Sequence, residues 1–351
     1  MLCLCQKFKL SIIKLMKKKA FCVLLFLGMS LFGSTQEPIL DKVTLNKRQI
    51  LVNNKPYIIK GICYHPVPIG KSERSFESID KDLALMTEAG VNTIRVYSPI
   101  DDLRVLNKID AAGLKVIIGF GYSDPNDHYN IRSGNYLNYI NTYKNHNAIL
   151  MWELGNEYNY HPEWFNGDLK NWYHALNNAA KAIHDNDLTH PVTTAHGDLP
   201  SNEALSLSAN IDVWGMNVYR MTRPESIYPE WKILSDKPMY FSEGGADSYM
   251  AVSAFGYQQG ENQKAQADAV KTIIENTFNS DGICSGITIF SFTDGWWKAG
   301  KADVQDIGGW APEGSGVPFD RIPNEEYWGI VDINRNKKEV FDVLKDLYLK
   351  Q

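Results

Sequence analysis

The sequence has 351 residues, of which 44% are hydrophobic and 22% are charged, a composition typical of a soluble globular protein with ample apolar material for a core. This mixture excludes intrinsic disorder and collagen-like repeats. With 36 basic against 41 acidic residues the formal net charge is -5, and no Lys/Arg-rich run lies outside the N-terminus. Nucleic acid is therefore not an expected partner. The length allows either two domains or one large α/β barrel.

The N-terminal residues predict a secretory leader over 1–35. Three lysines at 17–19 precede an apolar run at 20–32, and small or polar residues follow at 33–35, which is the order of a signal peptide cleaved near Thr35. Met16 is an alternative start. The apolar run is shorter than the ~20 residues that cross a membrane, so no membrane span is expected after cleavage. The mature protein is expected to be exported, to the periplasm or outside the cell.

Apolar, β-rich runs and helical segments alternate along the rest of the chain. Ile79, Leu83 and Met86 repeat at helical spacing, and Gly90 follows where a left-handed residue ends a helix. Strands that alternate with helices pair in parallel, and eight such units predict a single α/β domain, a (β/α)8 (TIM) barrel over 57–351. The predicted strands are 57–64, 91–97, 114–120, 148–154, 191–195, 211–218, 238–241 and 286–292. Further helical intervals are 170–184, 261–276 and 338–349.

Two further segments and two cysteines also carry predictions. Residues 36–60 predict a short N-terminal β-hairpin, with strands at 43–51 and 57–60 around Asn53-Asn54-Lys55-Pro56, packed against the lower end of the barrel. Residues 296–328 lack periodicity and predict a long loop that forms a wall of the site. Cys63 and Cys284 are expected to be free thiols, because the predicted strands place them at different heights of the barrel.

In a barrel of this type the site lies at the carboxyl ends of the strands. Glu157 and Glu243 each directly follow a strand too apolar to tolerate an unpaired charge, and by count they end the fourth and seventh strands. The other polar or aromatic residues that end the runs are His65, Arg95, Tyr97, Tyr122, Asn156, His196, Asn217, Tyr219, Asp294 and Trp296.

Two motifs carry a resemblance to a known group of enzymes. Residues 152–157 (WELGNE) and 240–244 (YFSEG) resemble the two catalytic motifs of the retaining β-glycosidases of glycoside hydrolase clan A. Residues 60–66 (KGICYHP) and 329–332 (GIVD) look most like the family-two barrel of β-galactosidases, β-mannosidases and β-glucuronidases. Residues 90–97 (GVNTIRVY) are also similar to β-1,3-glucanosyltransferases. The resemblance covers nearly all of the mature chain, which has space only for a hairpin where family-two enzymes usually carry sandwich domains.

The resemblance implies a pair of carboxyl groups with different roles. Glu157 would be the acid/base and Glu243 the nucleophile of a double displacement, and Asn156 would hold the sugar 2-hydroxyl. Arg95 is placed to keep Glu243 ionised, with a buried ion pair to a barrel Asp as the alternative, and Tyr219 could donate to the same carboxylate. Glu153 is interpreted as structural.

The remaining candidates are predicted to contact the sugar. His65 and His196 are equally well explained as core or rim histidines, and Asn217 stays open between a structural and a binding role. Aromatic rings stack on the apolar face of a pyranose, and we expect Trp296 to be the stacking platform while Trp297 points the other way. The other rings that could line the cleft are Tyr64, Tyr97, Tyr122 and Trp310. Trp152 and Trp214 lie inside predicted strands and are expected to be core residues.

The sequence therefore predicts an exported retaining β-glycoside hydrolase that acts on a polysaccharide or oligosaccharide. Two alternatives remain: a β-glucan transglycosylase that uses the same carboxyl groups, and a non-catalytic carbohydrate-binding barrel. No HxH, HExxH or clustered Asp/His pattern is present, so neither a metal nor a cofactor is expected.

Overall fold

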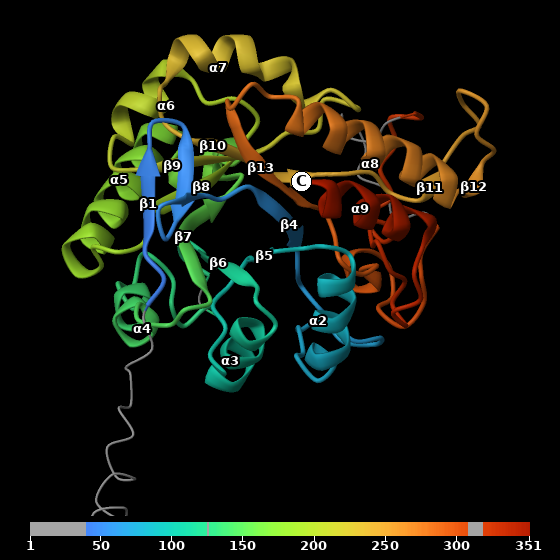
Figure 1. The fold of residues 1–351 in the computed structure, drawn as a ribbon, viewed down its shortest axis with the longest axis horizontal. Coiled ribbons are helices and arrows are strands. Elements are labelled where there is room, and N and C mark those ends of the chain that lie inside the picture. The colour runs from blue at the N-terminus through green and yellow to red at the C-terminus, as the bar shows by residue number, and fades with distance from the viewer. Residues whose placement is uncertain (1–39, 125, 308–318) are drawn as a thin grey trace, which may run out of the picture. The chain divides into compact units, whose positions relative to one another are not determined.

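The computed structural model describes residues 40–124, 126–307 and 319–351, and the expected leader at 1–35 lies outside them. Residues Asp41–Gln351 form one compact unit. Its centre is a closed barrel of eight parallel strands in the order β10-β13-β4-β5-β6-β7-β8-β9, which confirms the predicted (β/α)8 fold (Figure 1). The strands are β4 (Ile59–Cys63), β5 (Thr93–Val96), β6 (Lys115–Phe120), β7 (Ile149–Asn156), β8 (Val192–Gly197), β9 (Val213–Asn217), β10 (Met239–Gly244) and β13 (Cys284–Ile289).

Each barrel strand is covered on both faces, which explains why it reads as a continuous apolar run. Every residue of β5, β6, β8, β9 and β10 is buried. Helices pack around the outside of these strands (Figure 1). They are α2 (Ile79–Glu88), α3 (Leu103–Ala111), α4 (Tyr136–Tyr143), α5 (Leu169–Asn186), α6 (Asn202–Leu207), α7 (Tyr228–Leu234), α8 (Gln263–Phe278) and α9 (Glu339–Lys350).

The helix ends follow local chemistry. The side chains of Asp102, Asp168, Ser201 and Asn262 each accept a hydrogen bond from a backbone N–H in the first turn of the helix that follows. Gly90 has φ of 76°, the left-handed conformation that the sequence predicts after α2. The predicted helical intervals 170–184, 261–276 and 338–349 correspond to α5, α8 and α9.

The N-terminal strands differ from the predicted hairpin. The stretch 43–51 is not one strand, because the chain turns at Lys47, which has φ of 52°, and divides into β1 (Val43–Asn46) and β2 (Gln49–Val52). Residues Lys55–Pro56 form β3 rather than a turn, and the three strands make an antiparallel sheet in the order β1-β2-β3.

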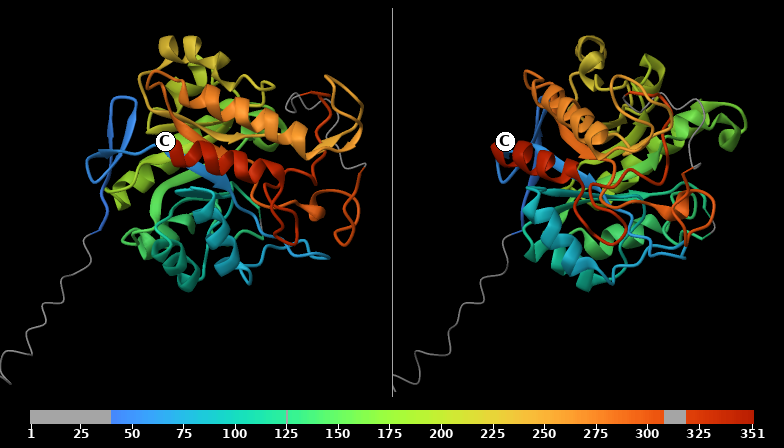
Figure 2. Two further views of the ribbon diagram at one scale, coloured as in Figure 1. Left: turned by 45° about the vertical axis from the view of Figure 1, so that its right-hand side comes forward. Right: turned by 90° about the vertical axis from the view of Figure 1, so that its right-hand side faces the viewer.

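This small sheet closes the lower end of the barrel, as predicted. Val43 and Ile50 pack with Ile59, Leu150 and Tyr240 in a separate apolar cluster. The long segment after β13 lies at the opposite end of the unit from β1 and β2 (Figure 2, left). That segment includes the 3-10 turn η4 (Trp296–Lys298), and part of it, 308–318, lies outside the described residues.

The two cysteines in the described residues, Cys63 and Cys284, are both free thiols, as predicted. Neighbouring strands β13 and β4 pair Gly286 with Ile59 and Ile289 with Ile62. In this register Cys284 lies six residues below Cys63, about 20 Å at ~3.3 Å per residue, which is far beyond disulfide reach. Within the described residues, no helix combines the length and apolarity that a membrane crossing requires.

Candidate active site

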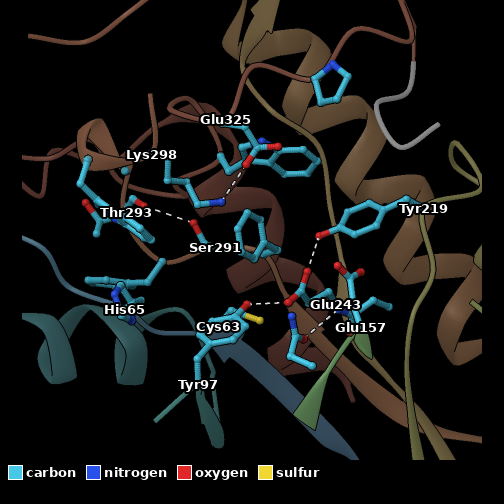
Figure 3. Close-up of a pocket in the computed structure, with 18 of the residues that line it drawn as sticks. Cys63, His65, Tyr97, Glu157, Tyr219, Glu243, Ser291, Thr293, Lys298 and Glu325 are labelled. Atoms are coloured by element: carbon cyan, nitrogen blue, oxygen red, sulfur yellow. Dashed lines mark hydrogen bonds and ion pairs between the residues drawn. The ribbon is translucent and has the colours of Figure 1, made fainter. Parts of the chain in front are cut away.

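A cavity of about 640 Å³ opens at the carboxyl ends of the barrel strands (Figure 3). Glu157 and Glu243 both line it, so the fold brings together the two carboxyl groups that the sequence places at the ends of separate strands. The other described lining residues are Cys63, His65, Tyr97, Asn156, Tyr160, Asp198, Asn217, Tyr219, Phe290, Ser291, Phe292, Thr293, Gly295, Trp297, Lys298, Pro323, Glu325 and Trp328.

The carboxylate of Glu243 is held by three donors from the ends of two strands, β5 and β9. Arg95 Nη1 donates to Oε1 at 2.8 Å. The Tyr97 hydroxyl donates to the same oxygen at 2.7 Å, and the Tyr219 hydroxyl donates to Oε2 at 2.9 Å (Figure 3). The residue is only 6% exposed. A buried carboxyl group that accepts hydrogen bonds on both oxygens is fixed in orientation.

Arg95 is the centre of this arrangement. It is fully buried, and its Nε and Nη2 atoms donate to both oxygens of Glu153, while Nη2 also donates to Asn156 Oδ1 at 2.8 Å. Glu153 accepts a further bond from the Tyr240 hydroxyl at 3.1 Å and does not line the cavity. Arg95 therefore has two buried carboxylate partners, Glu153 inside the barrel and Glu243 at the base of the cavity.

Glu157 follows β7 through a sharp change of backbone direction. Gly155 has φ of 72°, and a Cβ atom there would meet the Trp172 ring at 2.6 Å, so the position requires glycine. Glu157 itself has φ of 56°, a left-handed conformation that a glutamate adopts only at some energetic cost and that recurs at functional sites.

The surroundings of Glu157 favour its protonated form. Burial and the neighbouring charge of Glu243 raise the pKa of Glu157 to about 7, against a smaller opposing effect of a hydrogen bond from Asn217. The two carboxyl groups of the cavity thus have different surroundings. Glu243 accepts hydrogen bonds from three donors, whereas the raised pKa of Glu157 lets it hold a proton near neutral pH.

Asn156 and Asn217 both line the cavity and are oriented by one chain of hydrogen bonds. Asn217 Nδ2 donates to Asn156 Oδ1 at 3.1 Å, and Ser242 Oγ donates to Asn217 Oδ1 at 2.7 Å. Because Asn156 Oδ1 already accepts from both Arg95 and Asn217, the Asn156 amide nitrogen is the group that remains to donate to a ligand.

Of the two predicted histidines, only His65 lines the cavity. Its Nδ1 atom has no hydrogen-bond partner in the described part of the chain, and burial with nearby cationic charge lowers its pKa to about 4. His196 is a buried structural residue instead. Its ring forms hydrogen bonds with the Tyr173 hydroxyl at 3.2 Å and the Asp198 carbonyl at 2.9 Å, which fits the core alternative that the sequence left open.

The expected stacking platform is also corrected. Trp297, not Trp296, lines the cavity, with its ring 5.0 Å from that of His65. Residues 296–298 form a 3-10 turn, which places the Trp297 side chain on the cavity side. Three further candidates, Tyr64, Tyr122 and Asp294, do not line the cavity, and Trp310 lies outside the described residues.

Sequence reasoning missed the individual residues of the loop wall. Lys298 Nζ lies 2.9 Å from a carboxylate oxygen of Glu325 and 4.2 Å from the centre of the Phe290 ring (Figure 3). Trp328 lines the cavity beside Tyr219, with ring centres 5.6 Å apart. The segment 296–328 was predicted to form a wall, but without periodicity no pattern indicates which of its side chains face inward.

The arrangement can act on a bond placed between its two carboxyl groups, one a proton donor and the other an anion. No group of three or more His, Cys, Asp or Glu side chains in the described ranges is arranged to hold a metal ion. The aromatic rings and amides around the carboxyl groups match the mixed apolar and polar surface of a sugar.

Comparison with known proteins identifies the family. Residues 43–280 match the family described as glycosyl hydrolases family 2, TIM barrel domain. Similar solved structures include a β-galacturonidase of Eisenbergiella tayi bound to galacturonate, with 21% identity, a TM-score of 0.65, and coverage of 89% of this chain and 54% of that one. The β-glucuronidase of Faecalibacterium prausnitzii has 18% identity and a TM-score of 0.67, with coverage of 88% and 52%.

A β-glucuronidase of Dictyoglomus thermophilum is similar at 20% identity and a TM-score of 0.64, with coverage of 89% and 54%. The chain thus spans about half the length of these structures. No curated protein matches it. The match over 43–280 covers most of the chain and agrees with the closed eight-stranded barrel, so the chain belongs to glycoside hydrolase family 2, whose TIM barrel domain it contains.

Proposed function

We propose that this protein is a retaining β-glycosidase in which Glu157 is the acid/base and Glu243 is the nucleophile. The observation that supports the proposal most strongly is the contrast between the two carboxyl groups of one cavity. Glu243 receives hydrogen bonds on both oxygens from Arg95, Tyr97 and Tyr219, whereas burial and the charge of Glu243 raise the pKa of Glu157 to about 7. One group is thus an anion and the other a proton donor near neutral pH.

In the first step a Glu243 oxygen attacks the anomeric carbon while Glu157 gives its proton to the leaving oxygen. The bond from the anomeric carbon to that oxygen breaks, the leaving sugar departs as an alcohol, and the remaining sugar is esterified to Glu243. Asn156 holds the 2-hydroxyl of the bound sugar through its free amide nitrogen. This contact strengthens in the transition state of such reactions.

In the second step Glu157 acts as a base. Esterification removes the negative charge of Glu243, which is one of the two causes of the raised pKa of Glu157. The pKa of Glu157 therefore falls once the intermediate forms, and its carboxylate can take a proton from water as the water attacks the anomeric carbon. The product sugar is released with its original configuration, and Glu243 returns as an anion.

The proposal is tested by the configuration of the first product. Proton NMR of an aryl β-glycoside digest should show the β-anomer of the released sugar before it mutarotates, whereas an initial α-anomer would contradict a retaining mechanism. A 2-deoxy-2-fluoro glycoside with an activated leaving group should inactivate the enzyme and add one glycosyl group to the peptide that contains Glu243. Labelling of any other peptide would contradict the assigned nucleophile.

We also propose that the protein is exported. The support is the order of a basic segment, an apolar run and small polar residues within 1–35. N-terminal sequencing of the protein recovered from outside the cytoplasm should begin near Gln36. Recovery only from the cytoplasmic fraction with residues 20–32 still attached would overturn this proposal.

A further inference from the structure

The carboxyl groups around the cavity outnumber its cations. Glu157, Asp198, Glu243 and Glu325 line it, while Lys298 is the one Lys or Arg among the described lining residues. The segment 308–318, GGWAPEGSGVP, adds neither lysine nor arginine in its sequence. Because Glu243 is paired with Arg95, Asp198 with Arg220 and Glu325 with Lys298, a ligand that enters the cavity meets no free Lys or Arg among the described lining residues.

Lys298 is already paired within the protein. Its Nζ atom lies 2.9 Å from Glu325, and the same ammonium group sits 4.2 Å above the Phe290 ring. The side chains of Lys298 and Glu325 are 21% and 33% exposed, so water only partly screens the pair. A ligand anion would have to displace Glu325 to reach this cation.

The other cationic groups near the cavity are engaged too. Arg74, whose charge acts on His65, donates to the backbone carbonyl oxygens of Ser98 and Pro99. Arg220 makes two hydrogen bonds to Asp198, at 2.6 and 3.0 Å. Arg95 bonds to Glu153, Glu243 and Asn156 beneath the cavity. His65 is neutral near pH 7, because burial lowers its pKa to about 4. None of these groups is left to neutralise a carboxylate on the substrate.

We propose that Glu325, by occupying Lys298, makes this cavity selective for neutral sugars over uronic acids. This inference rests on the proposed glycosidase function and assigns Glu325 as a specificity-determining residue. It separates this chain from the similar solved structures, which are β-galacturonidases and β-glucuronidases.

The physical reason is the cost of an unpaired charge in a confined site. A hydroxymethyl group carries no charge and needs only ordinary hydrogen-bond partners. A carboxylate at the same position loses its water shell and faces the charges of Glu243 and Glu325 without a free cation. The neutral sugar can therefore bind without a counter-ion, whereas the negative charge of the acidic sugar has no cation to compensate it.

The test compares aryl β-glycosides that differ only in a hydroxymethyl group or a carboxylate, such as a β-galactoside and a β-galacturonide. We expect the wild-type kcat/KM for the better neutral substrate to exceed that for its uronide by about a hundredfold or more. Glu325→Gln removes the anion and leaves Lys298 available, and it should raise the ratio of uronide to neutral activity by about tenfold.

Two control variants isolate the effect. The double variant Glu325→Gln with Lys298→Gln should lose the gain, because the cation is then absent. Glu275→Gln makes the same charge change at an exposed ion pair with Lys271 on α8, and it should leave the ratio unchanged. A wild-type preference for the uronide, or an unchanged ratio in Glu325→Gln, would overturn the inference.

Binding separates this inference from the proposed function. Calorimetry with two imino-sugar inhibitors, one carrying a hydroxymethyl group and one a carboxylate, reports selectivity without turnover. If the protein binds the neutral inhibitor more tightly but hydrolyses no glycoside, the selectivity is supported and the proposed function is contradicted. Tighter binding of the acidic inhibitor would overturn the selectivity even in an active glycosidase.

Discussion

The base of the cavity is formed by buried residues at the strand ends, and its wall is formed by more exposed residues of a loop. We define the base as the strand-end residues Arg95, Tyr97, Glu157, Tyr219 and Glu243, and the wall as the loop residues Trp297, Lys298 and Glu325. Arg95 is fully buried and Glu243 is 6% exposed, whereas Trp297 is 37% exposed. Base residues are held by charge-assisted bonds between barrel strands, while in the wall Lys298 pairs with Glu325 and Trp297 packs beside His65. The base can therefore set the reaction, and the wall can set which substrate undergoes it.

The largest effect is expected at the nucleophile in the base. Glu243→Ala should reduce turnover to background on every substrate, because no other group can form the glycosyl ester. Added azide can enter the space and attack directly, and the glycosyl azide formed should have inverted configuration by NMR. A retained product from this variant would show that a different residue is the nucleophile.

The acid/base should show an effect that depends on the leaving group. Glu157→Ala should lower kcat/KM about 10²–10⁴-fold on substrates with poor leaving groups, because these need a proton to depart. Substrates with activated leaving groups should keep most of their first-step rate, and azide should accelerate their turnover and give a retained product. Equal loss on both substrate types would contradict the role of Glu157.

The pH profile sharpens the same point. Glu157 must be protonated in the free enzyme, and its pKa is raised to about 7 by burial and the charge of Glu243. Activity should thus be fully present below this value and fall about tenfold per pH unit above it, as measured by kcat/KM against pH. Glu157→Ala assayed with an activated substrate and azide should lack this alkaline decline, and a profile that keeps it would assign the titration to another group.

A smaller effect is expected when one donor to the nucleophile is removed. Tyr219→Phe deletes the 2.9 Å bond to Glu243 Oε2 and leaves the bonds from Arg95 and Tyr97. The kcat should fall about tenfold with little change in KM, since a single hydrogen bond to a charged group contributes about 1.5–3 kcal/mol. Tyr228→Phe removes a comparable buried bond to the Thr277 carbonyl away from the cavity, and it should leave kcat unchanged.

The smallest effect is expected in the wall. Trp297→Ala removes a half-exposed ring from the cavity rim, so KM should rise several-fold while kcat and Tm change little. Trp164 is 56% exposed and does not line the cavity, and Trp164→Ala should leave KM unaltered. A large fall in kcat for Trp297→Ala would remove the distinction between the base and the wall.

Sequence reasoning predicted the base better than the wall, for a physical reason. Barrel strands are buried on both faces, so each one reads as an apolar run, and the polar residue that ends it is conspicuous. Glu157 and Glu243 were identified in this way, and both line the cavity. His196 ends a strand as well, but its ring pairs inside the protein with Tyr173, which a single strand cannot reveal.

Short or irregular segments were predicted less well. The helices α4, α6 and α7 span eight, six and seven residues, too few turns for a clear periodicity. The turn at Lys47 contains no Gly or Pro, and Asn46 before it is only a weak turn signal, so 43–51 reads as one strand. In the wall, Lys298 and Glu325 meet across 27 residues of irregular chain, a pairing that depends on the loop path rather than on any local pattern.

Arg95 forms ion pairs with two carboxylates, Glu153 and Glu243, and this arrangement affects the charge balance during the reaction cycle. In the proposed mechanism Glu243 is an anion in the resting protein and a neutral ester in the intermediate, so the guanidinium group of Arg95 loses one partner halfway through the cycle. Glu153 stays bound to it through both oxygens. Arg95 therefore retains a counter-ion in both halves of the cycle, and the barrel interior never contains an isolated positive charge. The buried Glu153 thus neutralises Arg95 while Glu243 is esterified, and it stabilises the glycosyl intermediate without contacting the sugar.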